Sequence, residues 1–254
     1  MGTIKSQPPG VAEAGRFPPH SHFNPSSPYM NNSVCWFTLL IVSLSVSTSF
    51  AQDASKSEPN SVAIESAGYA LLFDGKSLDG WEGNHDWFRI EEKCIVAGST
   101  AKAIPHNEFL CTKVNYDNFE LKLQVRLKGQ GDNAGVQFRS KRISEKTEVS
   151  GFQCDVGNAF NRPVWGSLYD ESRRNKMLAE GDIDKVPSWL KKDDWNELTV
   201  KAEGDRIQIW LNGNLTVDYI EKDDKIAKTG IIGLQIHSGP PTEAWYRNIR
   251  IRKL

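Results

Sequence analysis

Apolar and polar residues alternate with a period of two along most of the chain after Tyr69, which is typical of half-buried β-strands. The longest such run covers residues 119–127, with nine alternating positions. Asn212-Gly213 separates two further alternating runs and favours a tight hairpin, because both residues tolerate positive φ. One short helical turn is expected within residues 184–194. Many antiparallel strands joined by polar turns predict an all-β sandwich or barrel.

The first fifty residues follow a different pattern. Residues 1–33 are rich in Pro, Ser, Asn and Gly, and the apolar run 34–46 fits the core of a signal peptide. Ser49 and Ala51 are the small residues expected before a cleavage site, and Met30 is an alternative translation start to Met1. We therefore expect an N-terminal extension with a signal peptide over 1–51, a polar linker over 52–68 and one domain over 69–254. Such a protein would be periplasmic or extracellular.

Composition narrows the possible functions. Lys plus Arg total 31 and Asp plus Glu total 32, so the net charge of −1 argues against a dedicated nucleic-acid binder. No internal run approaches the roughly 18 apolar residues of a membrane span, so none is expected after cleavage. Export would permit disulfides, and Cys94, Cys111 and Cys154 each lie in an apolar, strand-like run. The three cysteines could form one disulfide and leave one free thiol, or all three could stay as buried thiols. We favour three buried thiols.

Four strand-like segments carry unusual side chains on the face opposite their apolar residues. An ordinary solvent-facing strand carries Lys, Glu and Thr, whereas these segments carry amides, aromatic residues, one Arg, one Asp and one His. Such groups can bind sugar hydroxyls and sugar rings. If the strands are neighbours, these side chains form a concave polar surface. The alternative is an ordinary sheet with one solvent-exposed face. The residues are Gln137, Arg139, Gln153, Asp155, Trp165, Ser167, Tyr169, Gln235 and His237.

Short motifs follow one another in a characteristic order over residues 69–254. They include LLFDGKSLDGW at 71–81, NAGVQFR at 133–139, GFQCDVG at 151–157, GSLYDE at 166–171 and GLQIH at 233–237. Their order and spacing resemble the 3-keto-disaccharide hydrolase domain family. The resemblance implies a concanavalin A-like jelly-roll sandwich of two antiparallel sheets. It also implies a secreted enzyme that cleaves glycosides already oxidised to a ketone at sugar carbon 3.

This chain departs from the family pattern at two places. Ala134 stands where the family often has Ser, and Gln153 followed by Asp155 stands where it often has Glu followed by Gln. The carboxylate of this chain, Asp155, stands two positions after the family's Glu, so it lies on the same face of the strand. Its role in the cleft is therefore an open question at the level of sequence.

The implied substrate suggests a base-initiated elimination followed by hydration. A ketone at carbon 3 acidifies the carbon 2 proton, so a base can form an enolate that expels the aglycone from carbon 1. We expect His237 or Asp155 to be the base, and the other of this pair, or Glu171, to protonate the leaving oxygen. Arg139 would stabilise the negative charge on the enolate oxygen. Sugar binding is expected from Gln137, Gln153, Gln235 and Asn133, with Trp165 or Tyr169 stacking on the ring.

Several alternatives stay open. The domain could be a non-catalytic carbohydrate-binding domain or a structural adhesion domain, because fold does not decide function. His237 could be a structural histidine and Asp155 could pair with Arg139. Asp170 and Glu171 could form salt bridges with Arg173 or Arg174.

No cofactor and no catalytic metal is expected. The acidic loops 182–184 and 223–224 could bind structural calcium weakly, although their spacing is not diagnostic. The expected partner is a carbohydrate substrate, with a sugar 3-dehydrogenase acting upstream to supply the ketone.

Overall fold

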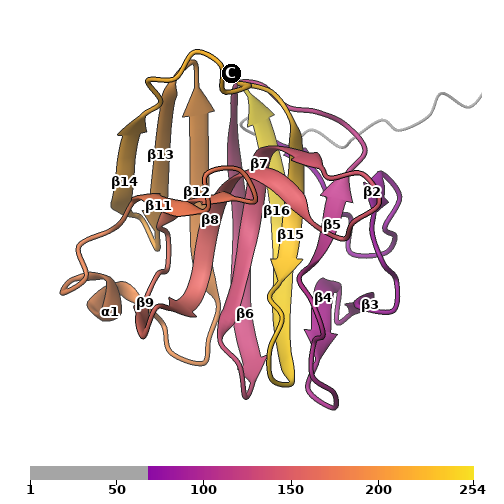
Figure 1. Ribbon diagram of the computed structural model, residues 1–254. Coiled ribbons are helices and arrows are strands. Elements are labelled where there is room, and N and C mark those ends of the chain that lie inside the picture. Colours follow the sequence, from indigo (N-terminus) through magenta and orange to yellow (C-terminus); the bar gives the residue numbers. More distant parts are fainter. Residues whose placement is uncertain (1–67) are drawn as a thin grey trace, which may run out of the picture. The chain divides into compact units, whose positions relative to one another are not determined.

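The computed structural model describes residues 68–254. The expected signal peptide over 1–51, and all of the expected linker except Gly68, lie outside the described residues. Two antiparallel β-sheets stack face to face, as Figure 1 shows. The prediction of an all-β, jelly-roll sandwich of two antiparallel sheets is confirmed. No helix in the described part of the chain is long and apolar enough to cross a membrane.

The first sheet contains eight strands, seven of which form a continuous order. In that order they are β14 (Asn214–Ile220), β13 (Arg206–Leu211), β12 (Asn196–Glu203), β6 (Phe119–Gly129), β16 (Thr242–Lys253), β4 (Cys94–Ser99) and β3 (Phe88–Glu91). The short strand β1 (Ala70–Leu71) also pairs with β16. The predicted hairpin at Asn212-Gly213 joins β13 to β14, and both residues have positive φ, which confirms the prediction.

The second sheet also contains eight strands. Their order is β11 (Lys176–Ala179), β10 (Leu168–Glu171), β8 (Val149–Ala159), β7 (Asn133–Arg142), β15 (Ile231–Ile236), β5 (Glu108–Thr112) and β2 (Trp81–Glu82), while β9 (Arg162–Pro163) pairs with β8. One helical turn, α1 (Val186–Trp189), lies within the expected range 184–194.

The core lies between the sheets and is built by the alternation seen in the sequence. Phe119, Leu121 and Leu123 of β6 face it from the first sheet, and Val136 and Phe138 of β7 face it from the second. All five are at most 1% exposed, which corresponds to about 1.5–3 kcal/mol of hydrophobic stabilisation for each larger side chain. Several polar side chains on the other face of the second sheet are buried as well: Gln137, Gln153, Asp155 and Gln235 are at most 6% exposed.

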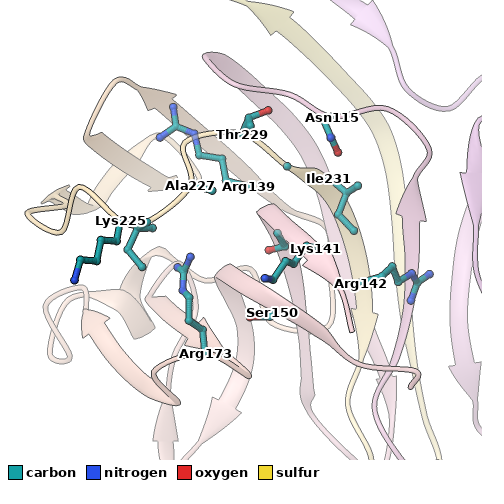
Figure 2. A pocket seen from close by; sticks show the side chains of 13 residues that line it. Asn115, Arg139, Lys141, Arg142, Ser150, Arg173, Lys225, Ala227, Thr229 and Ile231 are labelled. Atoms are coloured by element: carbon teal, nitrogen blue, oxygen red, sulfur yellow. The ribbon is translucent and has the colours of Figure 1, made fainter. Parts of the chain in front are cut away.

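A β-bulge between Phe138 and Lys141 interrupts the alternation of β7. Arg139 sits in this bulge with φ of 46°, and its side chain turns away from the face that carries Gln137. Its guanidinium donates to the carbonyl oxygens of Asp117 at 2.8 Å and Gly204 at 2.7 Å. Arg139 therefore ties β7 to the β12–β13 turn of the first sheet. It also lines a cavity at this end of the sandwich (Figure 2).

The three cysteines of the described chain are free and buried, as the sequence favoured. Burial raises the pKa of the Cys111 thiol to about 12, and it also raises the pKa of the Cys154 thiol, which lies in the core. Both thiols are therefore held in the unreactive protonated form.

Candidate functional site

A continuous chain of buried side chains crosses β7 and β8 on the outer face of the second sheet. Ser140 Oγ donates to Gln137 Oε1, Gln137 Nε2 donates to Gln153 Oε1, and Gln153 Nε2 donates to Asp155 Oδ1, each at 2.7 Å. These four side chains are at most 6% exposed. We call the face that they share with Tyr169, Glu171 and Gln235 the polar floor. The structure thus brings together most of the side chains that alternation placed on one face.

The strand register explains this arrangement. Gln137 and Tyr169 both lie directly across from Gln153, on opposite sides of β8. Gly135 lies between Asp155 and Gln235, across from both. A Cβ atom at Gly135 would lie 2.5 Å from the Gln153 side-chain carbon Cδ, so only glycine lets that amide lie over β7.

Asp155 carries the most strongly perturbed carboxyl group of the polar floor. Burial raises its pKa from the ordinary value of 3.8 to about 7, although the hydrogen bond from Gln153 opposes this rise. The charges of Glu171 and Glu180 raise the pKa further. A carboxyl group that titrates near neutral pH is suited to general acid–base chemistry.

Glu171 and Tyr169 project from β10 onto the same floor. Burial and the charge of Glu148 raise the pKa of Glu171, while the hydrogen bond from Ser172 and the charge of His237 lower it. The pKa of Tyr169 is raised by burial and by the charges of Glu171 and Asp155. No salt bridge joins Glu171 to either neighbouring arginine within the described residues, which leaves its carboxylate available.

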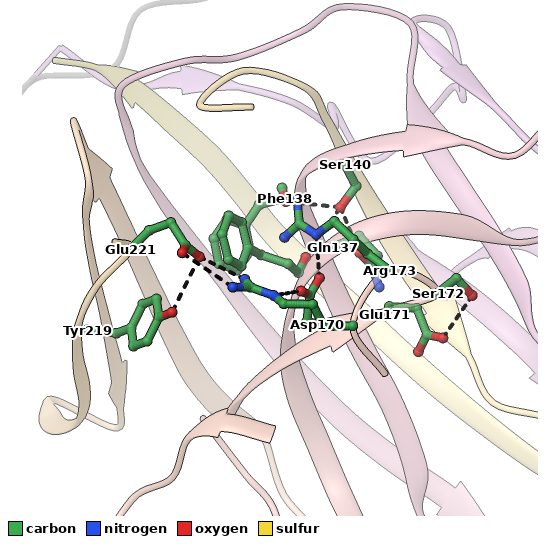
Figure 3. A network of polar contacts seen from close by, with 11 residues as sticks. Gln137, Phe138, Ser140, Asp170, Glu171, Ser172, Arg173, Tyr219 and Glu221 are labelled. Atoms are coloured by element: carbon green, nitrogen blue, oxygen red, sulfur yellow. Dashed lines mark hydrogen bonds and ion pairs between the residues drawn. The ribbon is translucent and has the colours of Figure 1, made fainter. Parts of the chain in front are cut away.

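Asp170, between these two residues, faces the sandwich interior instead. It accepts from Arg173 Nε at 2.7 Å and from Arg174 Nε, and Arg174 also pairs with Glu221 at 2.7 Å (Figure 3). The salt-bridge alternative is therefore correct for Asp170. This network fixes the end of β10 from which Glu171 projects.

Gln235 on β15 is fully buried, yet neither Nε2 nor Oε1 has a hydrogen-bond partner among residues 68–254. An unpaired buried amide is costly, at about 1–3 kcal/mol for each lost partner. It lies across Gly135 from Asp155, so the two polar groups share one row of the floor. A buried amide without partners requires an explanation, and a role in catalysis or in holding a bound molecule is one.

His237 and Asn133 lie at the far end of the floor, beyond the row of Asp155. The backbone N–H of His237 donates to the Asn133 carbonyl at 3.3 Å, and both residues line a small cavity of about 150 Å³. His237 Nδ1 lies 2.7 Å from the carbonyl oxygen of Ser238. Because a carbonyl only accepts, Nδ1 carries the hydrogen and Nε2 is left as an acceptor in the neutral ring.

Two expected site residues lie elsewhere. Arg139 faces the end of the sandwich because of the bulge, and its third donor reaches Asn118 Oδ1 at 3.1 Å rather than Asp155. Trp165 packs into the main core and lines a cavity with Leu127 and Leu190, so it is not a stacking platform on the floor. The positive φ of Gly166 redirects the chain between Trp165 and β10.

Sequence reasoning missed Ser140, which completes the chain of hydrogen bonds. Simple alternation places it on the core side of β7, and the bulge that returns it to the polar floor has no clear signature in the sequence.

The acidic loops show no assembled metal site. Asp182 pairs with Lys185 at 2.9 Å, and the Asp223 carboxylate accepts from the backbone of Lys225. Within residues 68–254, no group of three or more His, Cys, Asp or Glu side chains could hold a metal ion.

A family match and the name of a homologue together indicate a glycosidase-like, carbohydrate-active domain. The chain belongs to the family of 3-keto-alpha-glucoside-1,2-lyase-like domains, whose profile matches residues 68–252. The family expectation drawn from the motifs is therefore confirmed.

Individual relatives are distant. The chain is 21% identical to a 3-keto-disaccharide hydrolase of Bacteroides thetaiotaomicron, over 83% of this chain and 87% of that protein. A solved structure from Parabacteroides distasonis, provisionally named a glycosyl hydrolase, has a TM-score of 0.52 at 19% identity and covers 74% of this chain and 94% of its own. A Bacillus subtilis protein of unknown function with a galectin-like fold has a TM-score of 0.54 at 10% identity, covering 73% and 94%. These structural likenesses establish the shared fold.

Proposed function

We propose that this protein is an exported enzyme that cleaves 3-keto-glycosides by elimination and then hydration. Family membership supports the substrate class, because the family description names a lyase acting on 3-keto-glucosides and the Bacteroides relative is named a hydrolase. Elimination followed by addition of water accounts for both names in one reaction sequence. An upstream sugar 3-dehydrogenase would supply the ketone, in a periplasmic or extracellular setting.

Asp155 is proposed as the base. Its carboxylate removes the proton from carbon 2, and the electrons of that C–H bond form the enolate with the carbon 3 oxygen. Gln153 holds Oδ1 through a 2.7 Å hydrogen bond, while Oδ2 accepts no hydrogen bond from the described residues. The raised pKa of Asp155 makes it a stronger base than an ordinary carboxylate, yet it still ionises near neutral pH.

Gln235 replaces Arg139 as the group that steadies the enolate oxygen. Its Nε2 lies in the same row of the floor as Asp155 and donates to none of the described residues, whereas the three guanidinium nitrogens of Arg139 all donate elsewhere. A preorganised donor that meets the developing negative charge lowers the barrier without reorganisation.

Collapse of the enolate then breaks the carbon 1–oxygen bond, and the aglycone oxygen must take up a proton. Glu171 is the favoured acid, because burial and the charge of Glu148 raise its pKa above that of an ordinary glutamate. His237 is the alternative acid. Water then adds to carbon 1 while carbon 2 regains a proton, which gives net hydrolysis.

The observation that carries the proposal is the buried Asp155 carboxyl, whose pKa is raised to about 7 and which shares a row of the polar floor with Gln235 across strand β7. Its test compares an aryl glucoside with its 3-keto counterpart, using the wild type and Asp155→Asn. Only the keto compound should be cleaved, deuterium from D₂O should enter carbon 2, and Asp155→Asn should lose about 10²–10⁴-fold in turnover.

Asp184→Asn, at an exposed carboxylate, is the matched control and should keep full turnover. Comparable cleavage of the unoxidised glucoside would contradict the elimination. Saturable oligosaccharide binding without cleavage of either compound would favour the non-catalytic carbohydrate-binding alternative.

A further inference from the structure

The cavity that Arg139 lines at the end of the second sheet has a volume of about 390 Å³ (Figure 2). We call it the basic pocket, since five cationic side chains line it and none of the lining residues, all within the described chain, is acidic. The cations are Arg139, Lys141, Arg142, Arg173 and Lys225. Its volume falls within the roughly 300–1,000 Å³ range of small-ligand sites.

The positive charge of the basic pocket is only partly neutralised. Lys141 and Lys225 form no ion pair with any described residue, and Arg139 donates only to carbonyl and amide oxygens. Arg142 lies 3.4 Å from Glu82, and Arg173 pairs with Asp170, which Arg174 also contacts. The pocket therefore gathers more positive than negative charge.

Arg173 also presents an unused donor. Its Nε donates to Asp170 and its guanidinium lies over the Phe152 ring at 4.5 Å, while its Nη2 is buried and has no hydrogen-bond partner among the described residues. Burying such a donor unpaired is unfavourable, and a bound acceptor would satisfy it. A guanidinium fork is well matched to the paired oxygens of a carboxylate or a sulfate.

The basic pocket adjoins the proposed active site through one shared residue. Ser140 lines the pocket and also donates to Gln137 Oε1, the first amide of the polar floor. Arg173 follows Glu171 by two residues at the end of β10, so one wall of the pocket comes from the segment that carries the proposed acid. A ligand occupying both places would have its sugar ring on the floor and another group in the pocket.

We propose that the basic pocket binds an anionic group of the substrate, a carboxylate or a sulfate ester, so that the preferred substrates are acidic glycans. This inference rests on the proposed function for the placing of the keto sugar on the floor. Coulomb attraction between the anion and several cations in a partly buried site supplies the preference, and added salt weakens it.

The test measures binding of unoxidised disaccharides by calorimetry at low ionic strength, so that it needs no turnover. The probes are cellobiose, cellobiouronic acid and a sulfated cellobiose. At least one acidic probe should bind the wild type about tenfold more tightly than cellobiose, and the two acidic probes separate a carboxylate from a sulfate. The Lys141→Ala/Lys225→Ala variant should reduce that preference to less than about threefold.

The matched control is Lys76→Ala/Lys253→Ala, which removes two exposed lysines outside the pocket and should keep the full preference. Equal binding of neutral and acidic probes, no saturable binding of either acidic probe, or an equal loss in the control would overturn the inference. Turnover of a neutral 3-keto-glycoside by the wild type decides the proposed function separately, so the two proposals can fail independently.

Discussion

Gln153 donates its side-chain amide to Asp155 Oδ1 at 2.7 Å, while its own carbonyl accepts from Gln137 at the same distance. These hydrogen bonds run in one direction, from Gln137 through Gln153 to Asp155, and so fix the orientation of all three side chains. Gln153 accepts through its side-chain oxygen and donates through its side-chain nitrogen. Asp155 is thereby held with one oxygen occupied and the other free. The hydrogen bond favours the charged form of Asp155, but burial outweighs it and raises the pKa.

The first prediction concerns the pH dependence of turnover. If Asp155 is the base and removal of the carbon 2 proton limits the rate, kcat/KM on a 3-keto-glycoside should rise tenfold per pH unit below about pH 7 and level off above it. The residual activity of Asp155→Asn should lack this rise. A wild-type profile that is flat between about pH 5 and about pH 8 would rule out a titrating base with this pKa.

The second prediction concerns stability. The pKa of Asp155 is raised from 3.8 to about 7, so between these values the native state keeps a proton that the unfolded chain has released. The free energy of unfolding therefore falls as pH rises through this window, by up to about 1.4 kcal/mol per pH unit, and is constant above it. Asp155→Asn cannot titrate, so its stability relative to the wild type should increase from about pH 4 to about pH 7.

Urea unfolding of both proteins at about pH 5 and about pH 8 measures this difference directly. Other titrating groups are common to both proteins and cancel in the comparison. A difference that does not change with pH would mean that Asp155 is not buried with a raised pKa.

The third prediction separates binding from stability at Gln235. Gln235→Leu removes a fully buried amide that has no hydrogen-bond partner in the described part of the chain, so the variant should be as stable as the wild type or up to about 3 kcal/mol more stable. Its turnover should fall about 100-fold, because the donor to the enolate is lost. Thermal unfolding and kcat on a neutral 3-keto-glycoside measure the two effects.

Gln124→Leu is the matched comparison. Gln124 Oε1 accepts from Arg247 at 2.8 Å and from Asn248 at 3.1 Å on the first sheet, so this variant should lose stability and keep turnover. If both variants lose stability and neither loses turnover, Gln235 is an ordinary structural residue.

The fourth prediction tests the reassignment of Arg139. Arg139→Met removes three hydrogen bonds, to Asp117, Gly204 and Asn118, and should lower the free energy of unfolding by about 3 kcal/mol. Turnover of a neutral 3-keto-glycoside per folded molecule should stay within a few-fold of the wild type. A folded variant with normal stability and a 100-fold lower kcat would restore Arg139 to the role expected from sequence.

The fold could be predicted from the sequence because the signals for strands and turns are local. Alternation over 119–127 places the apolar side chains of β6 in the core, and the Asn212-Gly213 turn forms the hairpin that its φ preferences favour. The polar floor could be predicted in part for the same reason. Gln153 and Asp155 share a face because side chains two positions apart on a strand point the same way.

Where the prediction was wrong, non-local contacts decided the outcome. Alternation put Arg139 beside Gln137, but the bulge after Phe138 aims it at Gly204, which is 65 residues away in the chain. Trp165 has the spacing of a floor residue, yet the turn at Gly166 sends it into the core.

The sequence by itself determined the strands, the family and which side chains share a face within each strand, since these follow from a period of two and from local turn chemistry. Only the tertiary structure decided that Gln137, Gln153, Asp155 and Gln235 lie together and that they are buried. Register across three strands sets their neighbours, and removal of water sets the raised pKa of Asp155. Both effects depend on groups far apart in the chain, which local periodicity cannot encode.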